Sequence, residues 1–278
     1  MILGISSPLA HRTPEEWAAR HKALGLEAVV FPVSHLDGMQ TVQAYRKAAG
    51  DAGLCIAEVG VWRNTLAADP DERRRWIRYA IRQLEMADEI GALCCVNVVG
   101  TPYGPRWDGG YRDNFSEGLW DMAVRMIREI IDAVRPQRTK YCIEPMPWMI
   151  PGSPDECLRL LEAVDRPAFG THLDVVNMIT SPQRYFRNDA FLDECFAKLK
   201  GTICSCHLKD IRLREEYTFQ LEETACGAGS LDLERYARLA SAERPRMPLI
   251  IEHLDGDEAY LASVEYVQRR LGAYLDAR

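Results

Sequence analysis

The chain has 278 residues, of which 47% are hydrophobic and 27% charged, the composition of a globular protein rather than a disordered or fibrous one. Its formal net charge of -7 argues against non-specific binding to nucleic acid or to an anionic membrane, and no run approaches the roughly 18 apolar residues of a membrane span. The first residues show no signal-peptide pattern, so we expect a cytoplasmic protein whose nine cysteines are reduced.

Eight short apolar runs alternate along the chain with amphipathic helical stretches. Four of the helices begin with clear start signals, in which a capping residue precedes a proline, at 13–16, 69–72, 153–156 and 181–182. The runs are continuously apolar, which is typical of parallel strands covered on both faces. We predict strands at 2–6, 28–33, 55–61, 93–99, 141–144, 168–174, 203–208 and 249–253.

Eight strand-helix units of about 35 residues each predict an α/β fold of the (β/α)8 barrel type, formed by residues 1–278 as a single domain. A doubly wound open sheet is the alternative, but no glycine fingerprint follows the first strand. The glycines at 227–229 follow a charged loop, and we interpret them as a turn before a helix that starts near Leu231.

Four consecutive predicted strands end in side chains that can bind a metal. These are Glu144, Asp174, His207 and Glu252, separated by 30, 33 and 45 residues, each close to one strand-helix repeat. In a barrel the carboxyl ends of the strands meet at one face. Three carboxylates gathered there would repel one another without a cation. Three oxygen ligands and one nitrogen favour Mn²⁺, with Mg²⁺ and Co²⁺ as alternatives.

Five short motifs resemble the sugar phosphate isomerase/epimerase superfamily of xylose isomerase-like TIM barrels. They are IEP at 143–145, HLDVVN at 172–177, CHLKD at 206–210, the Gly-x-Gly-x-Leu-Asp at 227–232 and IIEH at 250–253. The resemblance covers essentially the whole chain and implies that Glu144, Asp174, His207 and Glu252 bind a divalent metal. It also implies that Glu144 and Glu252 act as an acid/base pair that enolises a keto-sugar through a metal-bound enediolate.

The chain departs from ketose 3-epimerases of that superfamily at three sugar-binding positions. Ile150, Asn177 and Leu213 stand where those enzymes carry glutamate, histidine and arginine. Because the four ligands are kept while these positions differ, we expect the metal to be retained and the substrate to differ from a simple free ketose. Asn177 is therefore a candidate substrate-binding residue, and so is Arg212, which precedes Leu213 in the sequence.

Other candidates for substrate binding lie near the predicted strand ends. Trp148 belongs to an apolar loop and could stack on a sugar or an aromatic group. Lys209 either contacts substrate or pairs with Asp210, and His35 follows the second strand. Glu58 or Trp62 could line the pocket too. His172 is interpreted as a core group or a support for the ligands, and His253 is expected to point away from the site. The glycine-rich loop at 100–115 is either a lid or a subunit contact.

A metal-dependent sugar isomerase or epimerase is the leading interpretation. A lyase of the same superfamily is the alternative, either an inosose or dehydroshikimate dehydratase or the large subunit of a C-glycoside deglycosidase that acts on 3-keto-glycosides. A non-catalytic carbohydrate-binding barrel is the alternative of another class. The resemblance further implies a small carbohydrate or keto-glycoside substrate and a homo-oligomer, with a small second subunit in the deglycosidase case. We expect no nucleic acid or membrane partner.

Overall fold

The computed structural model describes residues 1–275 and contains one sheet of eight parallel strands, in the spatial order β1-β10-β7-β6-β5-β4-β3-β2. The two outer strands meet where the Glu27 amide donates a hydrogen bond of 3.0 Å to the Leu3 carbonyl, so that the sheet curls into a nearly closed barrel. The predicted (β/α)8 fold is thereby confirmed. The strands are β1 (Ile2–Ile5), β2 (Ala28–Val30), β3 (Cys55–Gly60), β4 (Cys94–Asn97), β5 (Lys140–Ile143), β6 (Phe169–Leu173), β7 (Ile203–Leu208) and β10 (Pro248–Ile251).

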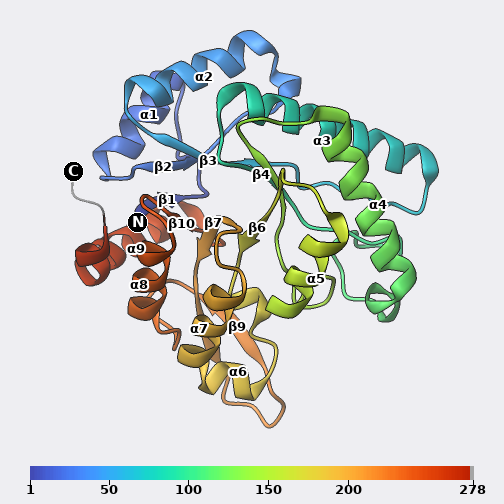
Figure 1. Ribbon diagram of the computed structural model, residues 1–278. Helices are drawn as coiled ribbons and strands as arrows, with labels where there is room; N and C mark the ends of the chain where they lie inside the picture. The colour runs from blue at the N-terminus through green and yellow to red at the C-terminus, as the bar shows by residue number, and fades with distance from the viewer. Residues whose placement is uncertain (276–278) are drawn as a thin grey trace.

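Helices surround the strands, as Figure 1 shows. Four of them begin at the predicted signals, where Thr13, Asp69, Ser153 and Ser181 each accept a hydrogen bond from the amide three residues later. None of the helices described is long and apolar enough to cross a membrane. The helices are α1 (Pro14–Ala23), α2 (Met39–Asp51), α3 (Pro70–Ile90), α4 (Glu117–Val134), α5 (Pro154–Val164), α6 (Pro182–Phe186), α7 (Asn188–Lys198), α8 (Leu233–Glu243) and α9 (Gly256–Leu271).

The interior of the barrel is filled with small side chains below the ends of the strands. One buried group contains Ile2, Ala28, Ala57 and Ile250, and a second contains the thiols of Cys94, Cys142 and Cys204. The nine cysteines all lie within the described residues and are all free, as predicted. Larger apolar side chains fill the space between the strands and the helices. The barrel floor is therefore apolar and packed, and polar chemistry is confined to its upper layer.

Two features differ from the sequence prediction. Several strands end one or more residues earlier than predicted, so Glu144, Asp174 and Glu252 follow their strands instead of ending them. Residues that were interpreted as a charged loop form an antiparallel hairpin of β8 (Asp210–Leu213) and β9 (Leu221–Thr224) between β7 and α8. Polar and apolar side chains alternate along β8, and the alternation Phe219-Gln220-Leu221 leads into β9, a pattern typical of strands that is masked here by the many charges.

Candidate metal centre

Four side chains converge at the carboxyl ends of β5, β6, β7 and β10. One ligand atom from each of Glu144, Asp174, His207 and Glu252 lies within 4.8 Å of the other three. The Nδ1 atom of His207 is 2.8 Å from Glu252 Oε2, 3.3 Å from Glu144 Oε1 and 3.7 Å from Asp174 Oδ2. All four side chains are buried, with at most 4% of each residue exposed. The four strand ends singled out in the sequence thus meet at one point.

Asn177 holds two of these carboxylates in place. It lies in a short 3-10 helix, Val176–Met178, directly after Asp174. Its backbone amide donates to Asp174 Oδ1 at 3.0 Å, and its side-chain amide donates to Glu144 Oε1 at 3.1 Å. The predicted substrate-binding residue is therefore engaged with the carboxylates themselves, because its short side chain fits between the two loops.

The carboxylates of the cluster bring together negative charge that a bound cation would neutralise. Burial raises the pKa of Glu144, an effect that His207 opposes and Glu252 reinforces. Burial would also lower the pKa of His207, but the carboxylates of Glu252 and Glu144 raise it well above its ordinary value. The carboxylates thus draw a proton onto His207. A divalent cation would occupy the same place, since it offers positive charge to all four ligand atoms at once.

The donor set fits a divalent metal of the hard or borderline class. Three carboxylates and one imidazole are ligands of Mn²⁺, Mg²⁺ and related ions. Asp174 Oδ2 lies 2.8 Å from the Lys209 ammonium and 3.7 Å from His207 Nδ1. A carboxylate oxygen has more than one lone pair, so Oδ2 can pair with Lys209 and still coordinate a cation. These residues can hold a metal, and their donor set suits more than one divalent ion.

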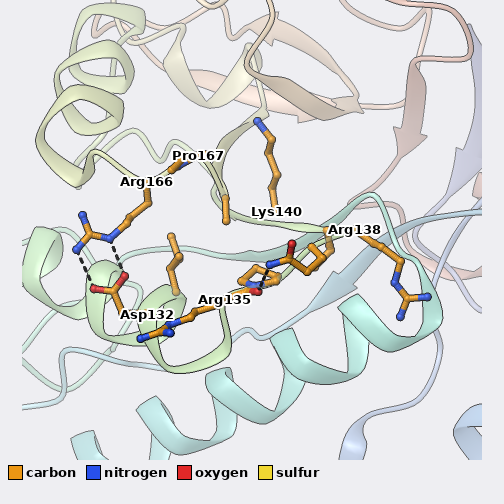
Figure 2. Close-up of a pocket in the computed structure, with 11 residues that line it drawn as sticks. Asp132, Arg135, Arg138, Lys140, Arg166 and Pro167 are labelled. Atoms are coloured by element: carbon orange, nitrogen blue, oxygen red, sulfur yellow. Dashed lines mark hydrogen bonds and ion pairs between the residues drawn. The ribbon is translucent and has the colours of Figure 1, made fainter.

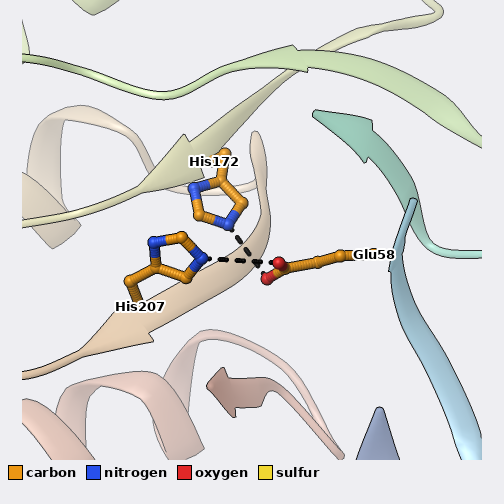
Figure 3. Close-up of side chains that lie close together, drawn as sticks. All are labelled: Glu58, His172 and His207. Atoms are coloured by element: carbon orange, nitrogen blue, oxygen red, sulfur yellow. Dashed lines mark hydrogen bonds and ion pairs between the residues drawn. The ribbon is translucent and has the colours of Figure 1, made fainter. Parts of the chain in front are cut away.

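A second group of buried polar residues, which includes Glu58 and His172, lies beside His207, as Figure 3 shows. Glu58 Oε2 is 3.4 Å from Nε2 of His207, the ring nitrogen that faces away from the other carboxylates. Glu58 Oε1 is 2.9 Å from His172 Nε2 and accepts a 2.5 Å hydrogen bond from Ser205. Burial alone would raise the pKa of Glu58, but the two imidazoles lower it, so this carboxylate is ionised. Glu58 would keep one proton on Nε2 of His207, so that on metal binding Nδ1 would release its own proton and present its lone pair to the ion.

Lys209 lies on the opposite side of the cluster and is buried as well. Its ammonium group is 2.8 Å from Asp174 Oδ2, 2.9 Å from Glu252 Oε1 and 2.9 Å from Glu223 Oε1. These carboxylates raise the pKa of Lys209 well above its ordinary value despite the opposing effect of burial. Glu223 also lies 2.8 Å from Nδ1 of His253, so the hairpin is tied to the centre by two ion pairs. Lys209 pairs with these groups and not with Asp210, the partner considered from the sequence.

A cavity of about 370 Å³ opens above the centre and is called the metal-centre cavity below. Two tryptophans, Trp62 and Trp107, form part of its wall, and Met146 and His253 lie at its edge. Aromatic faces beside a cluster of carboxylates are common in carbohydrate sites because C–H surfaces stack on them. Trp62 has a positive φ of 47°, which turns its side chain out of the strand direction.

The remaining predicted substrate residues lie elsewhere. Trp148 lines a neighbouring apolar cavity, not the metal-centre cavity. His35 lies on the outer side of β2, where its ring packs against Tyr79 and its Nδ1 is 2.7 Å from Gln83 Oε1. Arg212 is exposed on the hairpin and donates to Glu222 at 2.8 Å. The structure therefore does not bring His35 or Arg212 to the centre.

Another pocket, of about 460 Å³, lies at the start of β5, the end of the barrel opposite the metal centre (Figure 2). It is lined by four cations, and two of these, Arg166 and Arg138, have partners within the protein. Arg166 forms an ion pair with Asp132 and donates to the Asp165 carbonyl, while Arg138 donates to the Glu89 carbonyl. Since Asp165 and Glu89 lie at the ends of α5 and α3, these arginines cap helix C-termini. This pocket is not a candidate active site.

Two residues of the site were not identified from the sequence. Glu223 lies on β9, and the alternation Phe219-Gln220-Leu221 that precedes it is the signal that would have located this strand. His253 was expected to point away, but its φ of 56° rotates the chain after β10, so that the side chain lines both cavities. A positive φ at a non-glycine residue leaves no mark in a single sequence.

Comparisons with known proteins agree with this architecture. A family model described as a xylose isomerase-like TIM barrel matches residues 16–270. No curated protein gives a significant sequence match to the chain. Among solved structures, a xylose isomerase-like TIM barrel protein from Mycobacterium smegmatis in complex with magnesium is 18% identical, with a TM-score of 0.69 over 98% of this chain and 95% of that one.

Two further structural neighbours are enzymes of different reaction types. The 3-keto-D-glucoside 4-epimerase of E. coli is 14% identical, with a TM-score of 0.72 over 97% of this chain and 99% of that one. A probable 3-DHS dehydratase from Bacillus anthracis is also 14% identical, with a TM-score of 0.74 over 97% and 100% of the two chains. At such identities the likeness shows a shared fold.

Proposed function

We propose that this chain, which belongs to the xylose isomerase-like TIM barrel family, is a divalent-metal-dependent enzyme that enolises a keto-sugar and thereby isomerises or epimerises it. The observation that carries the proposal is the convergence of Glu144, Asp174, His207 and Glu252 at the open end of the barrel, with their ligand atoms within 4.8 Å of one another. Structural neighbours that act on keto-sugars support the substrate class.

Glu144, Asp174, His207 and Glu252 would hold the metal, and we favour Mn²⁺ among the ions that suit this donor set. When bound, such a cation stabilises the negative charge that develops on a carbonyl oxygen as the neighbouring carbon loses its proton. Glu58 would keep the proton of His207 on Nε2 and so leave Nδ1 free for coordination. Asn177 would hold Glu144 and Asp174 in register.

The proton transfers fall to the two glutamates. Glu144 follows β5 and Glu252 follows β10, and β6 and β7 lie between these strands in the sheet. One glutamate takes the proton from carbon and the other returns one, which inverts a carbon centre when the two act from opposite sides of the substrate. Lys209 donates a hydrogen bond to Glu252 and holds it in place.

Deuterium uptake from solvent tests the proposal directly. The Mn²⁺-loaded protein would be incubated in D₂O with free ketoses, inososes and methyl 3-keto-β-D-glucoside, and deuterium at carbon would be measured by mass spectrometry. We expect exchange with one substrate class and its loss, by at least 10³-fold, in Glu144→Gln and Glu252→Gln. Glu216→Gln is the control, because Glu216 lies in the turn of the hairpin, 3.6 Å from exposed Arg214, and is not among the residues that line either cavity.

Two outcomes would contradict the proposal. Exchange that survives unchanged in either glutamate variant would remove that residue from the chemistry. If Mn²⁺ changed neither the melting temperature nor substrate binding, the result would favour a non-catalytic carbohydrate-binding barrel. Tight metal binding to the native state raises the melting temperature.

A lyase reaction at the same centre is the second candidate. Removal of a proton next to a ketone also expels a leaving group at the β position, so the same glutamates would serve. The apolar cavity beside the centre favours this candidate, because it offers room for a leaving group that is not a sugar. A dehydratase is also among the structural neighbours. A lyase would release water or an aglycone from 3-keto-glycosides, whereas an isomerase or epimerase would release nothing.

A further inference from the structure

A second cavity, of about 560 Å³, lies beside the metal-centre cavity and is called the apolar cavity here. It is bounded by the loop after β5, the segment after β6 and the inner face of the β8–β9 hairpin. Both cavities are within the size range of small-ligand sites, about 300–1,000 Å³. The side chains that give this cavity its character are Met146, Trp148, Ile179, Ile211, Phe219 and Leu221.

The two cavities are adjacent. Met146 and His253 line both of them, and Asn177, which donates to Glu144, lines the apolar one. A molecule that extends from the four metal-type ligands past Met146 would enter the apolar cavity. The shared wall favours an occupant that is part of the substrate over a separate molecule.

The polar side chains around the apolar cavity have partners within the protein. Asn177 is bonded to Glu144 and Lys209, Glu223 lies 2.8 Å from His253, and Glu222 accepts a 2.8 Å hydrogen bond from exposed Arg212. A sugar placed here would lose hydrogen bonds to water and find few in exchange. The surface left for a ligand is hydrocarbon and aromatic ring, so hydroxyl-rich groups are disfavoured.

Two hydrogen bonds hold Trp148 in a fixed position. Its indole N–H donates to the Asp108 carbonyl at 2.6 Å, and its own carbonyl accepts a hydrogen bond from the buried Asn114 at 2.9 Å. Yet 40% of Trp148 remains exposed, as does 39% of Phe219 on the hairpin. Two large aromatic rings that line one cavity and stay partly exposed offer stacking surfaces to a planar ligand group.

We propose that the apolar cavity is a subsite for an aryl group attached to the sugar that binds at the metal centre. The substrate class is then an aryl glycoside or a similar sugar conjugate, with its polyhydroxylated part over the carboxylates and its ring beside Trp148 and Phe219. This inference rests on the proposed function for the position of the sugar, and it adds that the substrate carries an aryl group.

The test compares two ligands that differ only in the aglycone. Binding of phenyl β-D-glucopyranoside and methyl β-D-glucopyranoside to the Mn²⁺-loaded protein would be measured by calorimetry. We expect the phenyl glycoside to bind about tenfold more tightly, and Phe219→Ala to reduce that preference about fivefold while leaving the methyl glycoside unaffected. Tyr217→Ala is the matched control, because Tyr217 is an aromatic residue of the same hairpin that is fully exposed and does not line the cavity.

Trp148→Ala provides a second variant on a different loop, so the result does not depend on the hairpin remaining folded without Phe219. It should reduce the phenyl preference as well. The subsite is refuted if the phenyl glycoside binds no better than the methyl glycoside, including the case in which neither binds, or if neither variant alters the preference. Deuterium exchange into methyl 3-keto-β-D-glucoside reports on the proposed function separately, since that sugar has no aryl group.

Discussion

Replacing Glu58 with glutamine tests how His207 is prepared for a metal. Glu58 has no place among the four ligands, yet its ionised carboxylate accepts from Ser205 and faces Nε2 of both His172 and His207. The glutamine amide is nearly the same size but neutral, and it can turn N–H donors toward the imidazoles. The proton of His207 would then no longer be held on Nε2, and a fraction of the molecules would carry it on Nδ1, where it blocks coordination.

The expected loss of affinity follows from the geometry. Carboxylates that support a ligating histidine contribute about 10- to 100-fold to metal affinity. The contact between Glu58 Oε2 and His207 Nε2 is 3.4 Å, longer than the usual 2.7–3.2 Å of a hydrogen bond, so we expect the lower end of that range. Glu58→Gln should therefore weaken Mn²⁺ binding about tenfold, or about 1.4 kcal/mol.

Calorimetric titration of the metal-free protein with Mn²⁺ measures this effect, and the visible spectrum of the Co²⁺ form reports on the geometry of the bound ion. Ser205→Ala is the matched control. It removes a hydrogen bond from Oε1 of Glu58 but leaves Oε2, which faces His207, in place, so less than a threefold change is expected. A folded Glu58→Gln protein that binds Mn²⁺ with wild-type affinity would refute the reasoning.

Two further predictions concern the charges around the centre. Lys209→Met should destabilise the metal-free protein by about 3–5 kcal/mol, because buried carboxylates lose their partner, yet tighten Mn²⁺ binding, because the centre gains negative charge. Thermal unfolding and calorimetry measure both, and weaker metal binding would instead assign Lys209 a role in orienting the ligands. Glu223→Gln should lower the metal-free melting temperature more at pH 6 than at pH 8. The hydrogen bond with Glu223 raises the pKa of His253 above the ordinary histidine value of 6.5, so the stability from this pair is fully present below that pH and is lost as the pH rises through the raised pKa. Glu222→Gln should have equal effects at both pH values, since its partner is a guanidinium, a group that stays charged in proteins.

The barrel and the convergence of its four acidic and histidine side chains were predictable because their signals are local and repeated. The caps at Thr13, Asp69 and Ser153 define helix starts within four residues, and each apolar run marks a strand without reference to the rest of the chain. The carboxyl ends of parallel strands then meet by topology alone.

The surroundings of those four side chains depend on distant parts of the chain. Glu58 and His172 are 114 residues apart, and only the curvature of the closed sheet places both beside His207. The same holds for Asn177, whose identity marked a departure from ketose epimerases, while its contact with Glu144 depends on how two loops fold over the strand ends. Pairwise contacts of this kind carry no periodicity in the sequence.

The hairpin of β8 and β9 allows substrate selection to evolve separately from proton transfer, although in most active sites the same elements carry both. Asp210 anchors its base by accepting hydrogen bonds from the amides of Gly227, Gly229 and Leu231, so the segment between them can change length while both of its ends stay fixed. The groups proposed to move protons stand on the barrel, whereas Phe219 stands on this appendage. A change confined to residues 214–220, the turn that carries Phe219, would thus alter the glycoside that binds and leave Glu223 with its contacts to Lys209 and His253.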